Sequence, residues 1–368
     1  MFINFVLIVA LSGIQLSTAE FYPVMTKRLP RTMKAVVLQK YLPISDPSSL
    51  IDMEVNVPEL EDSQVLIEVR AISVNPIDTK IRAPKGEALN ATRILGWDGS
   101  GVVALKGSHA RTFNVGDEVF FTGDLRKNGS NAEYVAIDEI MVGAKPKNLN
   151  FEEAAAMPLT SVTAYEALFD RMLLSAKDKG KSLLIINSAG GVGAASIQLA
   201  KNVGLYVIGT ASRPESEAFS RRMGADLVLN HKEDLYAQLK VSGFSKGVDY
   251  IMVNFDPYPY WDLLMKIIKP QGTICLVVDC SRPVDIRLLK DKSVTLVSEM
   301  MGTRIRYDTE DKDRHHEILQ EISKLLEYKK MKTTLTKVIA PINAANLRDA
   351  HRLIEERRMI GKLVLSGF

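Results

Sequence analysis

The chain has 368 residues, 46% of them hydrophobic and 25% charged, so it is long enough to fold into two domains of ordinary size. Its formal net charge is only +3, and the basic residues are interspersed with acidic ones, which excludes the clustered basic surface of a nucleic-acid-binding protein. The 2 cysteines, Cys275 and Cys280, exclude a disulfide framework and a four-cysteine zinc site, and we expect both in the core.

The N-terminal segment is predicted to be a targeting sequence. Residues 2–16 are almost wholly apolar and uncharged, and the small residues Ser17, Thr18 and Ala19 follow them. This run is shorter than the about 20 apolar residues of a transmembrane helix, so we expect no stable membrane span. It predicts a signal peptide over residues 1–19 and entry into the secretory pathway or secretion. The alternative is a true start at Met33, which would leave the protein in the cytoplasm.

From Met33 the pattern predicts a β-rich, barrel-like domain. Short apolar and β-branched runs alternate with turns rich in Gly, Asn, Asp and Pro. The predicted strands are residues 34–38, 65–74, 99–103, 118–120 and 133–137. Helical spacing of apolar residues follows over residues 151–169.

After residue 181 the pattern changes to apolar strands that alternate with helices. The predicted strands are residues 182–186, 205–209, 227–229, 248–253, 273–278 and 294–297. Continuous apolar strands are typical of a parallel sheet that is covered on both faces. The second half of the chain is therefore predicted to be a doubly wound α/β domain.

The C-terminal tail is expected to return to the first domain. It is predicted to contain a helix over 314–328, a strand over 332–339, a helix over 344–356 and a strand over 361–365. The domain boundaries that follow are 33–155, completed by 305–368, and 156–304 for the α/β domain. His315 and His316 are adjacent on the first of these helices, so they point in different directions, and we expect an exposed helical face rather than a metal site.

The sharpest motif is the segment NSAGGVG at residues 187–193, between a predicted strand and a predicted helix. In this context a glycine turn predicts a dinucleotide-binding site. Gly190 lets the backbone approach a diphosphate, and Gly193 lets the helix pack closely on the strand. The N–H groups and the dipole of the helix start favour the phosphates. Ser188 stands where the usual pattern has its first glycine.

The residues after this turn favour NADP(H) over NAD(H). NAD-binding proteins usually have an acidic residue about 20 positions after the fingerprint, to bind the ribose hydroxyls. Here no acidic residue occurs between Asn187 and Pro214, and Ser212 and Arg213 end the second strand. A hydroxyl and a guanidinium suit a 2′-phosphate. Lys201 and His231 are further candidates for the same pocket.

With these motifs, the chain resembles the medium-chain dehydrogenase/reductases from Met33 to about Leu365. It is most similar to the quinone oxidoreductase branch and to its subgroup of zinc-type alcohol dehydrogenase-like proteins. The sequence segments that carry this resemblance are VNPID at 74–78, GWDGSG at 96–101, VGDEV at 115–119, PLTSVTAYE at 158–166, the glycine turn, TASRP at 210–214, MGAD at 223–226 and GKLVL at 361–365.

The resemblance implies a GroES-like β-rich catalytic domain and a Rossmann domain with a doubly wound parallel sheet, with the active site between them. It implies NADPH-dependent reduction of quinones or α,β-unsaturated carbonyls by a homodimer. By family position the cofactor would be held by the following residues: Asn75, Thr163, Ala189, Gly190, Gly191, Val192, Asn254, Val278 and Lys362.

The resemblance also bears on metal binding. Zinc-dependent members place a Cys, a His and a second Cys at sites that correspond here to 75–78, 96–98 and 159–160. None of these segments contains a Cys or His, so we expect no metal.

Reduction of a conjugated acceptor is easier without a metal than oxidation of an alcohol, because no alkoxide needs a Lewis acid. The candidate catalytic residues are Asn75, Asp78 and Tyr165. The proton donor stays open between Asp78, Tyr165, Trp97 and bulk water. Two alternatives remain: a metal-free NADP-linked alcohol or carbonyl dehydrogenase, and a non-catalytic NADPH-binding protein.

Overall fold

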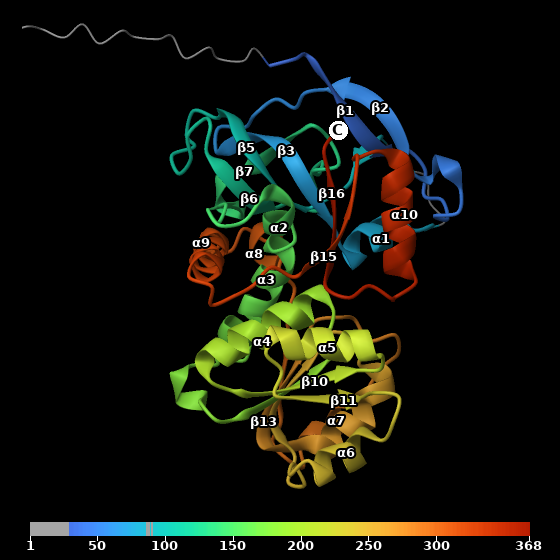
Figure 1. The fold of residues 1–368 in the computed structure, drawn as a ribbon, viewed down its shortest axis with the longest axis vertical. Helices are drawn as coiled ribbons and strands as arrows, with labels where there is room; N and C mark the ends of the chain where they lie inside the picture. The colour runs from blue at the N-terminus through green and yellow to red at the C-terminus, as the bar shows by residue number, and fades with distance from the viewer. Residues whose placement is uncertain (1–28, 86–88, 90) are drawn as a thin grey trace, which may run out of the picture. The chain divides into compact units, whose positions relative to one another are not determined.

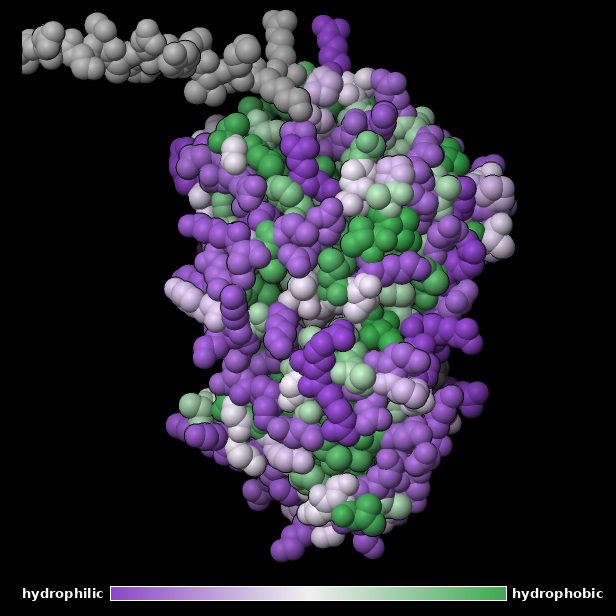
Figure 2. Space-filling view, viewed as in Figure 1, coloured by the Kyte–Doolittle hydropathy of each residue, from purple (hydrophilic) through white to green (hydrophobic). Residues whose placement is uncertain are grey.

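The computed structural model describes residues 29–85, 89 and 91–368, and residues 32–368 form one compact unit. The predicted signal peptide over 1–19 lies outside the described residues. No helix in the described ranges has the length and apolar character needed to cross a membrane. Hydrophilic side chains cover most of the face seen in Figure 2, with hydrophobic residues scattered between them.

The second half of the chain forms the predicted doubly wound domain. Its parallel sheet has the strand order β11-β10-β9-β12-β13-β14. The strands are β9 (Ser182–Ile186), β10 (Tyr206–Ala211), β11 (Leu227–Asn230), β12 (Val248–Val253), β13 (Ile268–Leu276) and β14 (Thr295–Ser298). The order reverses between β9 and β12, and ligands bind at such a reversal in open α/β sheets.

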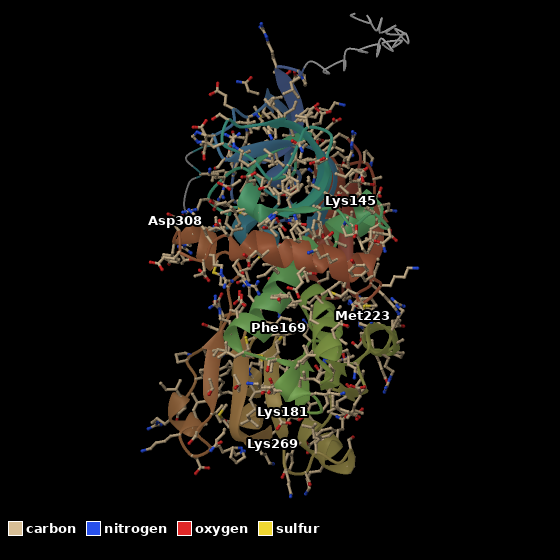
Figure 3. All side chains as sticks on the ribbon, turned by 90° about the vertical axis from the view of Figure 1, so that its left-hand side faces the viewer. Lys145, Phe169, Lys181, Met223, Lys269 and Asp308 are labelled. Atoms are coloured by element: carbon tan, nitrogen blue, oxygen red, sulfur yellow. The ribbon has the colours of Figure 1, made fainter. Side chains whose placement is uncertain are left out.

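Alternate residues of each strand point to opposite sides of this sheet. Because consecutive residues of the strands are apolar, both faces of the sheet are apolar. Leu183 and Ile185 pack in the core that includes helix α4 (Gly191–Val203), and Leu184 and Ile186 pack in the core on the other side. Helix α5 (Pro214–Met223) contributes to the first core, and helices α6 (Leu235–Val241) and α7 (Trp261–Ile267) contribute to the second. Lys181, just before β9, and Lys269, the second residue of β13, are labelled in Figure 3.

The first half of the chain forms the β-rich part. A sheet of the order β15-β16-β3-β5-β6-β8, with β7 paired to β3, lies beside a smaller sheet of the order β2-β1-β4 (Figure 1). The strands are β1 (Thr32–Leu38), β2 (Ile51–Asn56), β3 (Gln64–Val74), β4 (Arg93–Ile94), β5 (Asp98–Lys106), β6 (Glu118–Thr122), β7 (Tyr134–Asp138), β8 (Val142–Ala144), β15 (Leu335–Ile339) and β16 (Lys362–Ser366).

The C-terminal tail contributes to the sheet of the first half. Strand β16 pairs antiparallel with β3 and parallel with β15. Figure 1 shows helix α10 (Ala344–Glu355) beside helix α1 (Pro76–Arg82), although they are far apart in the sequence. Helix α9 (Arg314–Glu327) and the short α8 (Thr303–Arg306) lead into this tail. The exact domain boundaries stay a prediction.

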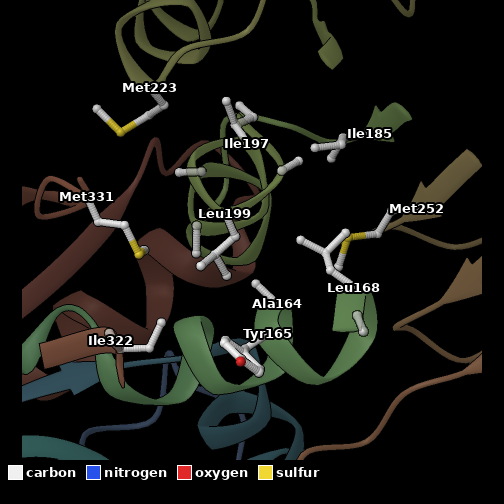
Figure 4. Packing of buried hydrophobic residues seen from close by; sticks show 14 of the residues in the cluster. Ala164, Tyr165, Leu168, Ile185, Ile197, Leu199, Met223, Met252, Ile322 and Met331 are labelled. Atoms are coloured by element: carbon white, nitrogen blue, oxygen red, sulfur yellow. The ribbon is translucent and has the colours of Figure 1, made fainter. Parts of the chain in front are cut away.

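Two details differ from the sequence-based expectations. The helix predicted over 151–169 is divided into α2 (Phe151–Ala155), α3 (Pro158–Tyr165) and a π-helix (Glu166–Arg171), because Pro158 has no N–H to continue the first helix. Figure 4 shows Ala164 of α3 directed toward Leu199 of α4. The exposed face expected at His315 is wrong: this side chain is fully buried, and its Nε2 lies 2.7 Å from the hydroxyl of Thr122.

Short 3-10 helices complete the described elements. They span Pro47–Ser49, Glu139–Met141, Ala176–Asp178, Tyr258–Tyr260 and Ile286–Leu289.

Candidate active site

The candidate site lies at the carboxyl edge of the six-stranded parallel sheet. Strands β9, β12 and β13 are in parallel register up to their last residues, so the loops that follow them begin at one edge. The glycine turn at 187–193 follows β9, and Asn254 and Val278 come after β12 and β13. The fold therefore brings these three predicted features to the same edge.

Ser188 replaces the first glycine of the fingerprint without crowding the turn. Its side chain is buried, and its hydroxyl donates to the carbonyl of Thr210 at 3.0 Å and lies 2.8 Å from the hydroxyl of Ser220. Gly209 lies against it in β10, where an added Cβ would be 2.6 Å from the Ser188 Oγ. The space that glycine usually provides in the turn is provided here by Gly209.

Gly190 and Gly193 of the turn have different surroundings. A Cβ on Gly193 would lie 2.6 Å from the carbonyl oxygens of Asn187 and Ser188, so only glycine lets α4 start this close to β9. A Cβ on Gly190 would come no nearer than 3.5 Å to any atom of the described residues. Packing within the protein therefore does not require glycine at 190, which leaves the close approach of a ligand as the reason for glycine there.

The start of α4 fits a diphosphate. No side chain of the described residues caps this helix, which begins at Gly191, and the first N–H groups of any helix lack intrahelical acceptors. The 13-residue helix also directs the positive end of its dipole to this turn. The N–H of Gly361 donates to the carbonyl of Ala189 at 2.8 Å, which fixes the turn against the segment before β16.

Ser212, Arg213 and His231 lie together at the ends of two neighbouring strands. Ala211 of β10 is in register with Asn230 of β11, so the residues that follow each strand are neighbours. The Arg213 guanidinium donates from Nη2 to the carbonyl of Arg358 at 2.8 Å. Burial lowers the pKa of His231 below its ordinary value, and the charge of Lys232 lowers it further.

Lys201 does not join this group. It lies in the last turn of α4, whereas the glycine turn precedes the first. Its Nζ is 2.8 Å from both carboxylate oxygens of Asp226 and donates to the carbonyl of Leu205 at 3.1 Å. The expectation that Lys201 contributes to a phosphate pocket is therefore corrected: its charge is neutralised at the other end of the helix.

Asn254 has the hydrogen-bonding capacity that a ligand could use. Its side-chain oxygen and nitrogen are buried and have no hydrogen-bond partner in the described part of the chain. Buried polar atoms in proteins nearly always have partners, so this amide is able to bind a polar group of a ligand. Thr163 is different, because its hydroxyl already donates to the carbonyl of Leu159 at 2.8 Å within α3.

A buried cluster of polar side chains lies where β3, β5 and β16 meet. The Lys362 ammonium donates to the Asn75 Oδ1, to Asp98 Oδ2 at 3.1 Å and to the carbonyl of Val74 at 3.3 Å. The Asn75 Nδ2 donates to Asp98 Oδ2 at 2.9 Å and to the carbonyl of Ser73 at 3.2 Å. The amide of Asn75 is therefore fully used within the protein.

Asp78 belongs to the same cluster but keeps one oxygen free. Its Oδ2 accepts the backbone N–H of Asn75 at 2.7 Å, while its Oδ1 is buried and has no partner among the residues described. Burial raises the pKa of Asp78 to about 7, and the nearby Asp98 carboxylate also raises it. The N–H of Asn75 and the Lys362 ammonium partly oppose that rise. Asp78 can therefore hold a proton near neutral pH.

Lys362 connects this cluster with the glycine turn. A Cβ on Gly191 would lie 2.7 Å from Lys362 Cδ and 2.8 Å from the methyl carbon of Thr160. The lysine stem thus packs on the first residue of α4, while its ammonium lies beside Asn75 and Asp98. The predicted cofactor turn and the predicted acid are brought together by one side chain.

Tyr165 lies apart from this cluster. Its hydroxyl donates to Glu321 at 2.7 Å and accepts from Arg314 at 3.2 Å, and both partners are on α9. Burial and the neighbouring Glu321 raise the pKa of Tyr165 to about 12. The hydroxyl is therefore a weak acid that is already paired, and the structure does not bring it to Asp78.

The cluster does not fit a zinc ion. The places that carry zinc ligands in metal-dependent relatives hold Asn75, Trp97 and Leu159, and the ammonium of Lys362 contacts the first of them. Among the described residues, no group of three or more His, Cys, Asp or Glu side chains could hold a metal ion.

The sequence reasoning missed two residues of the site. Asp98 accepts from Lys362, from Asn75 and, at 3.1 Å, from the backbone N–H of Leu159. Its signal was present in the GWDGSG segment, where it follows the position of a zinc-binding His. Thr160 packs on Gly191, and its Oγ1 is buried without a partner in the described ranges.

Comparisons with known proteins show similarity over both halves of the chain. The family described as alcohol dehydrogenase GroES-like domain matches residues 61–147, and the family described as zinc-binding dehydrogenase matches residues 191–315. A zinc-type alcohol dehydrogenase-like protein of Staphylococcus epidermidis is 42% identical over 337 residues, which are 91% of this chain and 99% of that protein. The NADPH-dependent alkenal/one oxidoreductase of Arabidopsis thaliana chloroplasts is 34% identical over 272 residues, 71% of this chain and 66% of that one.

Solved structures show the same fold. A structure from Rhizobium etli CFN 42, whose name places it among zinc-dependent alcohol dehydrogenases, superposes with a TM-score of 0.87 at 38% identity and covers 92% of this chain and 99% of its own. The quinone oxidoreductase from Coxiella burnetii superposes with a TM-score of 0.76 at 29% identity, covering 92% of this chain and 100% of its own. The chain therefore belongs to the medium-chain dehydrogenase/reductase superfamily of oxidoreductases, in its quinone oxidoreductase-like branch.

Proposed function

We propose that this oxidoreductase uses NADPH to reduce quinones or α,β-unsaturated carbonyl compounds without a metal ion. The observation that carries the proposal is the contact of Lys362 with Gly191 at one end and with the Asn75 and Asp98 side chains at the other. It joins a turn that suits a dinucleotide to a cluster in which Asp78 can hold a proton. Names of relatives support the same chemistry, since one is an NADPH-dependent alkenal/one oxidoreductase and another a quinone oxidoreductase.

The residues of this chain divide the work as follows. A nicotinamide cofactor supplies hydride when it is bound. The turn at 187–193 and the start of α4 would hold the diphosphate, and the free amide of Asn254 would orient the adjoining ribose. Arg213 and Ser212 would bind the 2′-phosphate with charge-assisted hydrogen bonds. Val278 would border the nicotinamide end of the same edge.

Asp78 is the proton donor in this proposal. Addition of hydride to the β-carbon of an enone leaves an enolate, and protonated Asp78 would donate its proton to the α-carbon and become a carboxylate. Water then returns a proton to Asp78. The carbon–carbon double bond is reduced by one hydride and one proton, so the negative charge of the hydride and the positive charge of the proton cancel in the product.

The test is a screen of NADPH oxidation over quinones, enones and enoyl thioesters, with purified protein that starts at Glu20 or Met33. We expect turnover that chelators do not reduce. NADH should be at least about tenfold poorer, because a charge-assisted hydrogen bond contributes about 1.5–3 kcal/mol. Oxidation of an alcohol panel with NADP would favour the alcohol dehydrogenase alternative. Tight NADPH binding with no acceptor reduced would favour the non-catalytic one.

Arg213→Ala and Lys201→Ala make a matched pair for the cofactor assignment. The first should weaken NADPH binding by about tenfold or more while NADH binding stays unchanged. The second should change neither, because Lys201 is paired with Asp226 at the far end of α4. Equal effects of both variants would contradict the assignment of Arg213.

We also propose a homodimer, as the family resemblance implies. Within the described residues β14 pairs only with β13 and forms one edge of the parallel sheet. An unpaired strand edge is open to pairing with a second copy. Light scattering coupled to size-exclusion chromatography should give twice the mass of one chain, and a monomer mass would refute the dimer.

A further inference from the structure

The hydrogen bonds of Lys362 define its protonation state. Its Nζ contacts three groups that only accept, namely the carbonyl of Val74, the Asn75 Oδ1 and the Asp98 Oδ2. Three acceptors around one nitrogen favour an ammonium over a neutral amine, and the Asp98 carboxylate opposes the burial that lowers the pKa of Lys362. The side chain is only 4% exposed, so this charge is held inside the protein.

The hydrogen bonds of Asp98 define a carboxylate in the same way. Its Oδ2 accepts from Lys362 and from the Asn75 Nδ2, and its Oδ1 accepts the backbone N–H of Leu159. All three partners are N–H donors, so each contact suits a carboxylate and opposes the burial that raises the pKa of Asp98. A fully buried carboxylate and a buried ammonium therefore form an ion pair in which both oxygens of Asp98 and the Lys362 Nζ have hydrogen-bond partners.

This ion pair joins segments that are far apart in the sequence. Asp98 begins β5 and holds the first turn of α3 through Leu159, and Lys362 begins β16 and holds Asn75, the residue before α1. The lysine stem also packs on Gly191 at the start of α4. One pair of charges thus connects the phosphate-binding turn with the helix start that carries Asp78.

We infer that Lys362 is a positioning residue whose ion pair with Asp98 provides the fixed charge of the active site and leaves Asp78 as the group of the cluster that exchanges a proton. The role in catalysis rests on the proposed function, whereas the ion pair and the proton on Asp78 can be tested without turnover. This pair also explains why the cluster does not fit a zinc ion, since an ammonium already lies among the donor groups.

The first experiment is a double-mutant cycle of unfolding in urea, with Lys362→Met, Asp98→Asn and the double variant. Lys362→Met keeps the stem but leaves the Asp98 carboxylate buried and unpaired, so its urea midpoint should fall sharply. Asp98→Asn leaves the Lys362 ammonium unpaired, so its urea midpoint should also fall. The double variant removes both charges and should recover most of the loss. Additive losses in the double variant would refute a fixed ion pair.

The second experiment reads the proton on Asp78 through the pH dependence of kcat/KM with an enone. Activity should fall as Asp78 loses its proton. Lys362 lowers the pKa of Asp78 and Asp98 raises it, so Lys362→Met should move the midpoint up and Asp98→Asn should move it down, each by about one pH unit. The double variant should return close to the wild type. Lys201→Met is the control and should not move the midpoint.

A purely structural role would reduce activity at every pH without moving the midpoint, and that result would overturn the inference. If Lys362→Met does not fold, Asp98→Asn and the double variant still decide the direction of the shift. If the protein shows no reductase activity, the proposed function fails. The opposite shifts in the pKa of Asp78 can still be measured from the pH dependence of urea unfolding, when each variant is compared with the same variant that also carries Asp78→Asn. Identical pH dependence in all of these variants would then refute the inference on its own.

Discussion

Replacing Asp78 with Asn removes a carboxyl group whose pKa in the folded protein is raised to about 7, so that it can hold a proton near neutral pH. The change is nearly isosteric, and the Asn oxygen can still accept the N–H of Asn75 that Asp78 accepts at 2.7 Å. What is lost is the titration, because burial of the side chain raises the pKa of Asp78 from 3.8 to about 7. The comparison of the two proteins over pH therefore isolates this single proton.

The expected size follows from linkage. The folded state binds this proton more tightly than the unfolded chain, so the stability it contributes is full below pH 3.8 and is lost as the pH rises to about 7. One pKa unit corresponds to about 1.4 kcal/mol, so the total change is about 4 kcal/mol. The wild type should lose stability relative to Asp78→Asn by this order of magnitude between about pH 4 and pH 8.

Urea unfolding at several pH values, followed by far-UV circular dichroism, measures this difference. Other buried groups titrate as well, such as Glu166, whose pKa is raised to about 9 by burial and by Glu299. Their contributions are common to both proteins and cancel in the comparison. If the free-energy difference between wild type and Asp78→Asn stayed constant within about 1 kcal/mol over this range, Asp78 would not hold the proton and our reasoning would be refuted.

Three further perturbations test other parts of the structure. Gly190→Ala should leave the melting temperature almost unchanged and weaken NADPH binding by about tenfold or more, whereas Gly193→Ala should destabilise the protein by about 2 kcal/mol because its Cβ would meet two carbonyl oxygens at 2.6 Å; calorimetry of both variants distinguishes the two glycines. Tyr165→Phe should cost about 1 kcal/mol of stability, since it loses the bond to Glu321, and keep kcat within about twofold in a steady-state assay. Arg304→Met should cost about 3 kcal/mol or more in urea unfolding, because the buried guanidinium contacts Glu166 at 2.7 Å and the Asp170 and Asp311 carboxylates at 2.9 Å; a loss below about 1 kcal/mol would contradict this expectation.

Local patterns were sufficient to predict much of the fold. The apolar runs after residue 181 predicted the six parallel strands, because a strand covered on both faces must be apolar at consecutive positions. Boundaries were less accurate: β13 begins at Ile268 rather than at residue 273, and helix α1 was missed although it begins with Pro76, a typical first helical residue. Strand β2 was missed although Ile51, Met53 and Val55 alternate with polar residues, as in a partly exposed strand.

The sequence by itself determined the glycine turn at 187–193, the absence of an acidic residue after it and the parallel sheet, because each depends on neighbouring residues of known conformational and hydrogen-bonding preference. Only the tertiary structure decided that Lys362 joins Asp98 and Asn75, that Lys201 is paired with Asp226, and that Tyr165 is directed to α9. These partners are separated by 25 to 287 positions in the chain. Which of these partners a side chain contacts depends on burial and on nearby charges. Both are properties of the folded chain and not of its local sequence.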